Sequence, residues 1–228
     1  MRLAISCAFF LTVSVGYSQT KLYPKSEISQ HQGLSAFEAK LRSVIANGDT
    51  TTLFTLLDED ILNGFGGEGG VEEFKQYWNL PKGLEKLWLT LTELLGLGGT
   101  IDKDPDNGEV IGATWPYTFT HFPDELDAYN YMVVIGSGVA LREKPSIDSK
   151  VIARLSYDVL PYDYDLTYRN KANPIPEEGF EYVKWIALTY KGQTGYVSSK
   201  YVRSPIDYRM SVLYDNGEWK IVILVAGD

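Results

Sequence analysis

The side chains that most often perform acid–base or nucleophilic chemistry are scarce in this chain of 228 residues. There are two histidines, His31 in a polar segment and His121 between aromatic residues, and one cysteine, Cys7, inside an apolar run. The nucleophile-elbow pattern of Ser–His–Asp hydrolases is absent. The 30 acidic residues allow many carboxylate pairs of the glycosidase kind, so sequence alone singles out none. We therefore predict no catalytic residue, and we expect His121 to be a packed residue of an aromatic strand.

A glycine-rich segment, Gly64-Phe65-Gly66-Gly67-Glu68-Gly69, matches the pattern of dinucleotide-binding loops. That chemistry requires a strand immediately before the loop and a βαβ unit around it. Here the leucine-rich stretch before the loop predicts a helix, and no alternation of strands and helices follows. We interpret the segment as a connector between helices, and no cofactor is predicted.

Three aspartates at alternate positions, Asp102, Asp104 and Asp106, suggest a calcium loop. An EF-hand loop starting at Asp102 would need glycine at its sixth position and glutamate at its twelfth. The chain has Asn107 and Ala113 there. We interpret this segment as a solvated acidic turn, and no metal site is predicted.

Tyrosine and aspartate alternate in the segment 157–168. In a strand, Tyr162 and Tyr164 would share one face, and Asp163 and Asp165 would share the other. One interpretation is a half-buried strand with its tyrosines in the core. The other is a binding groove of flat rings rimmed by carboxylates, which suits sugars by stacking and amines by cation–π attraction.

The amino terminus has the layout of a cleaved secretory signal. Arg2 precedes the apolar run 3–15, and small residues lie at Gly16 and Ser18. The run is shorter than the ~20 residues of a spanning helix. A buried first strand or helix is the alternative. We predict cleavage after Ser18 and an exported protein, periplasmic or extracellular. A lipid anchor is rejected because too little apolar sequence precedes Cys7, the only cysteine, which cleavage would remove.

The charge balance narrows the possible partners. Lys and Arg total 21 against 30 Asp and Glu, which gives a net charge of −9. Such a chain is repelled by phosphate backbones and by anionic lipid, so we expect neither nucleic-acid nor membrane-surface binding. No segment after the signal is apolar for long enough to span a bilayer.

The amino-terminal half of the chain is predicted to be mainly helical. After a polar lead-in at 19–33, Ser35 and Glu38 fit a capping box, and an apolar stripe follows as far as Gly48. Three more helices are expected, a second through Ile61, a third over 71–78 and a fourth over 84–95. Residues 110–122 are expected to be extended.

The last twenty residues predict a β-hairpin. Segments 208–214 and 218–225 flank Asn216-Gly217, a pair that supplies the positive φ angles of a tight hairpin turn. Residues 221–225 are apolar on both faces, so both faces should be covered. Because an isolated hairpin is not stable, we expect this one to join the sheet of the amino-terminal region.

Residues 139–202 open with Val139-Ala140-Leu141-Arg142-Glu143-Lys144-Pro145-Ser146 and close with Gly192-Gln193-Thr194-Gly195-Tyr196-Val197-Ser198-Ser199-Lys200-Tyr201-Val202. This pattern resembles the bacterial SH3-like (SH3b) family. The resemblance implies a small β-barrel that binds cell-envelope polymers or peptides and is not a catalyst. Strands are expected at 132–135, 140–142, 151–155, 159–164, 180–188 and 195–197.

The chain departs from the SH3b pattern at two places. The family's Trp-x-Lys-Val strand stands here as Tyr182-Val183-Lys184-Trp185, so the ligand-facing position falls on Tyr182. Residues 165–179 form a longer insertion than is usual.

The flanking regions resemble the cystatin-like, nuclear-transport-factor-like α+β family. We therefore predict an α+β fold with a signal at 1–18, a lead-in at 19–33, a helix-rich domain at 34–128 completed by the hairpin at 205–228, and an inserted barrel at 129–204.

The function predicted from these features is non-catalytic binding of a peptidoglycan fragment or peptide. The predicted ligand-binding residues are Tyr162, Asp163, Tyr164, Asp165, Tyr182 and Trp185. One alternative is a hydrolase or inhibitor acting from a pocket of the α+β domain. A deep pocket that holds a carboxylate of raised pKa would favour the hydrolase. Another is a structural docking protein, which would show a broad exposed apolar patch.

Overall fold

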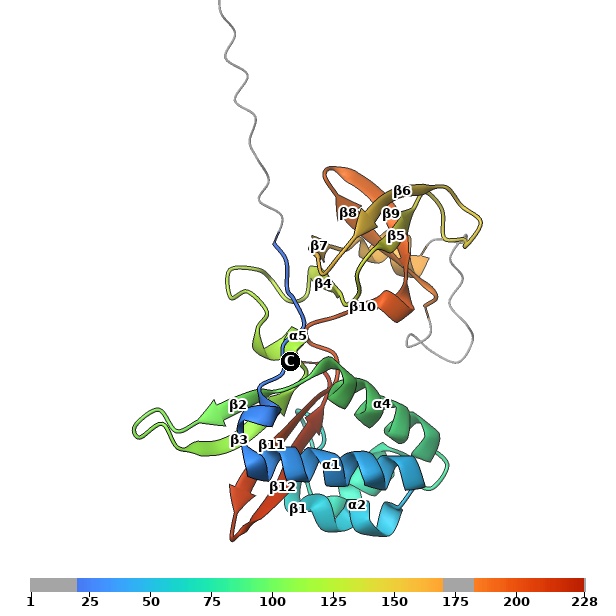
Figure 1. The fold of residues 1–228 in the computed structure, drawn as a ribbon. Helices are drawn as coiled ribbons and strands as arrows, with labels where there is room; N and C mark the ends of the chain where they lie inside the picture. The colour runs from blue at the N-terminus through green and yellow to red at the C-terminus, as the bar shows by residue number, and fades with distance from the viewer. Residues whose placement is uncertain (1–19, 170–182, 228) are drawn as a thin grey trace, which may run out of the picture.

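The computed structural model describes residues 20–169 and 183–227, and the chain is a mixed α+β protein (Figure 1). The predicted signal at 1–18 and Tyr182 lie outside the described residues. Helices packed on a five-stranded sheet form one part, called here the helical unit. Two small sheets built from residues 131–203 form the other, called here the β unit.

The helical unit takes its five strands from distant parts of the chain. The strand order is β1-β12-β11-β3-β2, antiparallel except for the β1–β12 pair. The helices are α1 (Gln32–Asn47), α2 (Thr50–Leu56), α3 (Val71–Tyr77), α4 (Leu84–Leu97) and the short α5 (Tyr117–Thr120). The strands are β1 (Leu57–Leu62), β2 (Thr100–Lys103), β3 (Val110–Trp115), β11 (Arg209–Asp215) and β12 (Glu218–Val225).

The first helix begins earlier than its capping box predicted. The amide of Leu34 donates to Nδ1 of His31, which caps the helix, and Ser35 instead donates its hydroxyl to the carbonyl of Ile28. Burial of Leu34 explains the extra turn, because it extends the apolar stripe toward the amino terminus. The helix ends as expected at Gly48, whose φ of 61° suits a residue without Cβ.

The second predicted helix is wrong beyond Leu56. The chain there enters strand β1, in which Leu57 and Ile61 both face the core. A spacing of four residues fits one face of a helix and also one face of a strand, so the apolar pattern could not separate the two. The third and fourth predicted helices are confirmed as α3 and α4.

The carboxy-terminal hairpin forms as expected. Asn216 and Gly217 have φ angles of 49° and 88° and join β11 to β12, with Asp215 opposite Glu218. Strand β12 pairs with β1 and β11 pairs with β3, so both hairpin strands lie inside the sheet. Helices α1, α2 and α4 cover one face of this sheet (Figure 1). The buried hairpin side chains that join their core are Met210, Val212, Ile221 and Leu224.

Two antiparallel sheets make the β unit. One has the order β10-β4-β7 and the other β6-β5-β9-β8. A bridge between Tyr162 and Leu188 links them, and they share one apolar core. No closed barrel is shown by the described residues. The strands are β4 (Tyr131–Val134), β5 (Val139–Arg142), β6 (Val151–Leu155), β7 (Val159–Pro161), β8 (Trp185–Tyr190), β9 (Gln193–Ser198) and β10 (Val202–Arg203).

Residues 20–31, expected to be a loose lead-in, instead tie the two units together, and this segment is called here the strap. Lys21 pairs with Asp158 of the β unit, and the amide of Leu22 donates to the carbonyl of Tyr157. Farther along, the amide of Glu27 donates to the carbonyl of Gly99 in the helical unit. The prediction missed the strap because its partners lie far away in the sequence.

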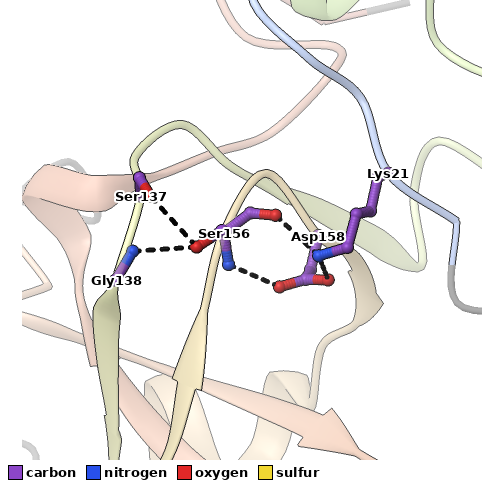
Figure 2. A network of polar contacts seen from close by, with 5 residues as sticks. All are labelled: Lys21, Ser137, Gly138, Ser156 and Asp158. Atoms are coloured by element: carbon purple, nitrogen blue, oxygen red, sulfur yellow. Dashed lines mark hydrogen bonds and ion pairs between the residues drawn. The ribbon is translucent and has the colours of Figure 1, made fainter.

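An ion pair between the partly exposed Lys21 and the buried Asp158 anchors the strap in the β unit (Figure 2). Lys21 Nζ donates to Asp158 at 2.6 Å and to the carbonyl of Ser156 at 2.8 Å. The second oxygen of Asp158 accepts from the amide of Ser156 at 2.7 Å. Beside this network, Leu22 packs into an apolar cluster with Tyr117 of α5 and Val133 of β4, so the two units share a core at their junction.

Candidate functional site: a cleft between the two units

The largest hollow that we describe is a cleft of about 1150 Å³ between the helical unit and the β unit. Helix α4 lines one side. The other side comes from β4, β8, β10 and the segment 204–208 that leads back into the helical unit. The site therefore depends on both units, and neither alone would form it.

Helix α4 and the turn before it supply a polarised wall. Lys82, Lys86, Leu89 and Glu93 line the cleft, and their spacing of three or four residues places them along one helix face. Leu89 is apolar and 64% exposed, and it lies between the basic residues and the acidic residue of this helix face.

Arg203 of β10 organises the acidic end. Its side chain is only 3% exposed, and it donates to Glu93 at 2.5 Å and to the carbonyl of Tyr208 at 2.6 Å. Asp207 lies 3.7 Å from the same guanidinium. The carboxylates of Glu93 and Asp207 are 53% and 45% exposed, so this end of the cleft presents negative charge to solvent.

Aromatic rings lie at the basic end. The rings of Trp78 and Tyr208 stack with centroids 5.1 Å apart, and the ammonium of Lys86 lies about 6 Å from both rings. Cations over aromatic faces at this distance are attracted by the ring quadrupole. Lys86 is thus held beside the cleft mouth.

The alternating Tyr–Asp segment is not the strand that its pattern predicted. Strand β7 ends at Pro161, and a helical turn at Asp165–Arg169 follows. Asp163 caps this turn by accepting from the amide of Leu166, so its carboxylate is already engaged. Aspartate favours such caps over strand interiors, which explains why the alternation misled.

The helical turn separates the predicted ligand residues. Tyr162 is half-buried against the core of the β unit, whereas Tyr164 is 45% exposed and stacks on Tyr168 at 4.8 Å. Tyr168 lines the cleft, and Asp165 pairs with Arg169 at the surface. We call Tyr164 and Tyr168 the aromatic platform.

The remaining predicted ligand residue that the structure describes lies on β8. Trp185 begins that strand and is half-buried, and its neighbour Ile186 lines the cleft. Tyr168 and Ile186, neighbours of the predicted residues, thus line the cleft, but none of the predicted ligand residues that the structure describes does so itself.

Sequence reasoning missed the α4 wall and the segment 204–208. The sequence has Lys86, Leu89 and Glu93 at a spacing that places them on one face of a helix. On most helices such a face is only exposed to solvent, so the pattern did not indicate a site. Only the position of β10, fixed by its pairing with β4 (Tyr131–Val134), places that face opposite a second wall.

His121 is not the aromatic-strand residue that we expected. It follows α5, and its Nδ1 lies 2.9 Å from Thr120 Oγ1 and 3.2 Å from Thr100 Oγ1. Its Nε2 lies 3.3 Å from Lys25 Nζ. A lysine ammonium only donates, so Nε2 accepts and the ring proton lies on Nδ1, directed at the threonine hydroxyls. In that tautomer the ring cannot take a proton from Thr120, and the arrangement is no hydroxyl–histidine nucleophile.

Burial and neighbouring charges change the pKa values of His121 and of nearby acidic residues. Burial lowers the pKa of His121, as does Lys25, and the charge of Glu27 opposes them. Burial raises the pKa of Asp102, and donation by Thr114 at 2.8 Å opposes it. Asp102 lines neither of the two hollows that we describe, so this raised pKa does not meet the pocket criterion of the hydrolase alternative.

The glycine-rich loop joins a strand to a helix, β1 to α3, and not two helices as predicted. Two of its amides are already used, because the carboxylate of Glu73 accepts from the amides of Glu68 and Gly69, and it also accepts from the side chain of Asn63. An added Cβ on Gly67 would lie 2.3 Å from that carboxylate. An internal anion thus fills the place that a phosphate would need.

Comparison with known proteins gives no match: no protein-family model, no curated protein and no solved structure is significantly similar to this chain. Across residues 20–169 and 183–227, no group of three or more His, Cys, Asp and Glu side chains is placed to hold a metal ion. No helix within the same ranges has the length and apolarity needed to cross a bilayer.

Proposed function

We propose that this chain is an exported binding protein without catalytic activity, and that it holds a cell-envelope ligand, a peptidoglycan fragment or a peptide. The observation that carries the proposal is the cleft between α4 and the β unit. It is about 1150 Å³ in volume, just above the ~300–1,000 Å³ of most ligand sites. It combines apolar side chains with a few charged ones at its ends.

The β unit supports the proposed kind of ligand. Its two antiparallel sheets share a core and carry the opening and closing segments that resemble SH3-like domains. We propose that it is an SH3-like module and that the aromatic platform extends the cleft outward. Flat rings such as Tyr164 suit stacking on sugars or on peptide groups.

A pull-down against purified sacculi, with soluble muropeptides as competitors, tests this proposal. Leu89→Arg would place a long charged side chain in the middle of the cleft, and we expect it to reduce the bound fraction at least about tenfold, the effect of ~1.4 kcal/mol. Leu89 is exposed, so the variant should fold.

Ile147→Arg is the matched control, because Ile147 is equally exposed, at 68%, but does not line the cleft. It should bind like the wild type. Tyr164→Ala should weaken binding several-fold through loss of one ~0.5–1.5 kcal/mol stacking contact. Binding of Leu89→Arg at the wild-type level would show that the cleft is not the site.

A further inference from the structure

A second hollow lies within the helical unit, apart from the cleft. Its volume is about 510 Å³, within the ~300–1,000 Å³ of most ligand sites. Helix α1, the end of α2 and the tip of the β11–β12 hairpin form its walls, so a single unit is enough to build it. We call it the hairpin groove, and the lining residues that decide its chemistry are Gly33, Lys40, Tyr214, Glu218, Trp219 and Lys220.

Two aromatic side chains meet at the tip of the hairpin. Tyr214 of β11 lies opposite Trp219 of β12, and their ring centroids are 4.9 Å apart with the rings inclined by 49°. Tyr214 is 54% exposed, so much of its ring is open to a ligand. Tyrosine and tryptophan each combine a large apolar face with a polar edge. Such a surface matches a sugar, which has an apolar C–H face and a rim of hydroxyls.

The start of α1 fixes the position of Trp219. The ring of Trp219 meets His31 edge-on, with centroids 5.6 Å apart. A Cβ on Gly33 would lie 2.8 Å from its Nε1, so only a glycine leaves room for the indole there. Nothing among the described residues accepts a hydrogen bond from this N–H, and unlike the indole nitrogens of Trp78 and Trp115 it is not sealed from solvent. The groove therefore holds a fixed donor that can meet an acceptor of a ligand.

The groove is positively charged, although the whole chain has a net charge of −9. Lys220 is compensated, because its ammonium pairs with Glu218 at 3.1 Å and donates to the carbonyl of Thr55 at 2.7 Å. Lys40 of the α1 wall is exposed, and its ammonium takes part in none of the ion pairs or hydrogen bonds of the residues that the structure describes. Its charge therefore remains uncompensated within the groove and attracts an anion.

We propose that the hairpin groove binds an acidic sugar, a pyranose that carries a carboxylate. The sugar ring packs on Tyr214, the indole N–H of Trp219 donates to an oxygen of the sugar, and the carboxylate pairs with Lys40. This is a second site, and it does not depend on what the cleft between the two units binds. A neutral sugar would leave Lys40 unused, and an aliphatic acid would leave the ring of Tyr214 unused.

The test is an NMR titration of the full chain with glucuronate, its methyl ester and benzoate. The indole N–H signal of Trp219, assigned by its loss in Trp219→Phe, reports binding. The ester keeps the sugar ring and lacks the charge, so we expect it to bind about two- to fivefold more weakly than glucuronate, the effect of one exposed ion pair. Added salt should weaken the acid and leave the ester unaffected. Benzoate keeps the charge and lacks the hydroxyls, and it should also bind more weakly than glucuronate.

A substitution of Lys40 tests the charged contact. Lys40→Gln should weaken glucuronate by about two- to fivefold and leave the ester unchanged, because the ester lacks the charge that Lys40 meets. Lys103→Gln, an exposed lysine of β2 that does not line the groove, is the matched control and should change neither.

A substitution of Tyr214 tests the ring contact. Tyr214→Ala should weaken the acid and the ester alike, several-fold, because it removes packing and no charge. Tyr201→Ala is the matched control, since Tyr201 is 50% exposed and lies outside the groove. Both positions are exposed, so both variants should fold.

This inference and the proposed function can fail separately. Leu89→Arg, which obstructs the cleft, should leave glucuronate binding unchanged, and loss of that binding would place the sugar in the cleft and overturn the groove site. An unmoved Trp219 signal, equal affinities for the acid and the ester, or wild-type affinity in Lys40→Gln would also overturn it. Benzoate that binds as tightly as glucuronate would overturn the assignment to a sugar. None of these results affects the binding of muropeptides or sacculi at the cleft.

Discussion

At the scale of single residues, Asp158 is the most consequential charge in the molecule. It is 1% exposed, and Lys21 Nζ is its only cationic partner among the ion pairs of the described residues. A buried carboxylate that loses its partner keeps its desolvation cost without the compensating attraction. The pair therefore stabilises the strap only while both members are present.

Lys21→Met should lower the free energy of unfolding by about 1–3 kcal/mol, less than for a fully buried pair because part of Lys21 meets solvent. Urea unfolding followed by circular dichroism measures the change. Lys103→Met, at an exposed position, should stay within about 0.5 kcal/mol of the wild type. Equal stabilities of the two variants would show that the strap contributes nothing through Lys21.

His121 makes stability depend on pH. Its pKa in the folded protein lies below the ordinary value of 6.5, chiefly because of burial, so the unfolded chain binds a proton first as pH falls. Stability should therefore decrease as pH falls through about 6.5 and level off below the lowered pKa of the folded state. His121→Gln should lack this part of the pH dependence. Unfolding curves at pH 7.5, 6.5 and 5.5 test it, and parallel loss in both proteins would contradict it.

At the scale of elements, the carboxy-terminal hairpin is the structural centre of the helical unit. Strands β11 and β12 lie between β1 and β3, and they bury Met210, Val212 and Ile221 under the helices. A protein truncated after Ser204 would leave β1 without a partner strand, β3 paired with β2 alone, and the helix faces open to water. Several core side chains would be lost at once.

We therefore expect truncation after Ser204 to abolish the cooperative thermal transition of the helical unit, measured by calorimetry. A milder version replaces Ile221 by Ala, which should cost about 2–4 kcal/mol for a buried aliphatic side chain. Leu213→Ala, on the exposed side of β11, should cost much less. A truncated protein that melts as cooperatively and as high as the full chain would show that the hairpin is an appendage.

The elements also show where sequence reasoning succeeds. Local signals were sufficient for α3, for α4 and for the Asn216-Gly217 turn, because each depends on residues close in the chain. They failed where one pattern fits two structures, as at Ile61 in β1 and at Asp163, whose side chain caps a turn. For Ile61 the deciding partner is the distant strand β12, whereas Asp163 is decided locally, by a cap on the amide of Leu166 three residues away.

At the scale of the whole molecule, the candidate site could be predicted only in part. Aromatic residues of the segment 157–168 were recognised, and Tyr168 does line the cleft. The wall built by α4 and Arg203 could not be predicted, because it exists only where the two units meet. The strap and the apolar cluster around Leu22 fix that meeting, and both join residues more than a hundred positions apart.

The strand order of the helical unit also determines when the protein can fold during its synthesis. Strands β11 and β12 are synthesised after every other strand that the structure describes, yet they occupy the middle of the sheet, and Leu57 pairs with Ile221 across most of the chain. Contacts between residues so distant form slowly, because a long loop must close first. The emerging helices therefore lack their sheet until translation has passed residue 225. Under the export that we propose, this delay would be an advantage, since a polypeptide that has not yet folded can pass through a narrow translocation channel.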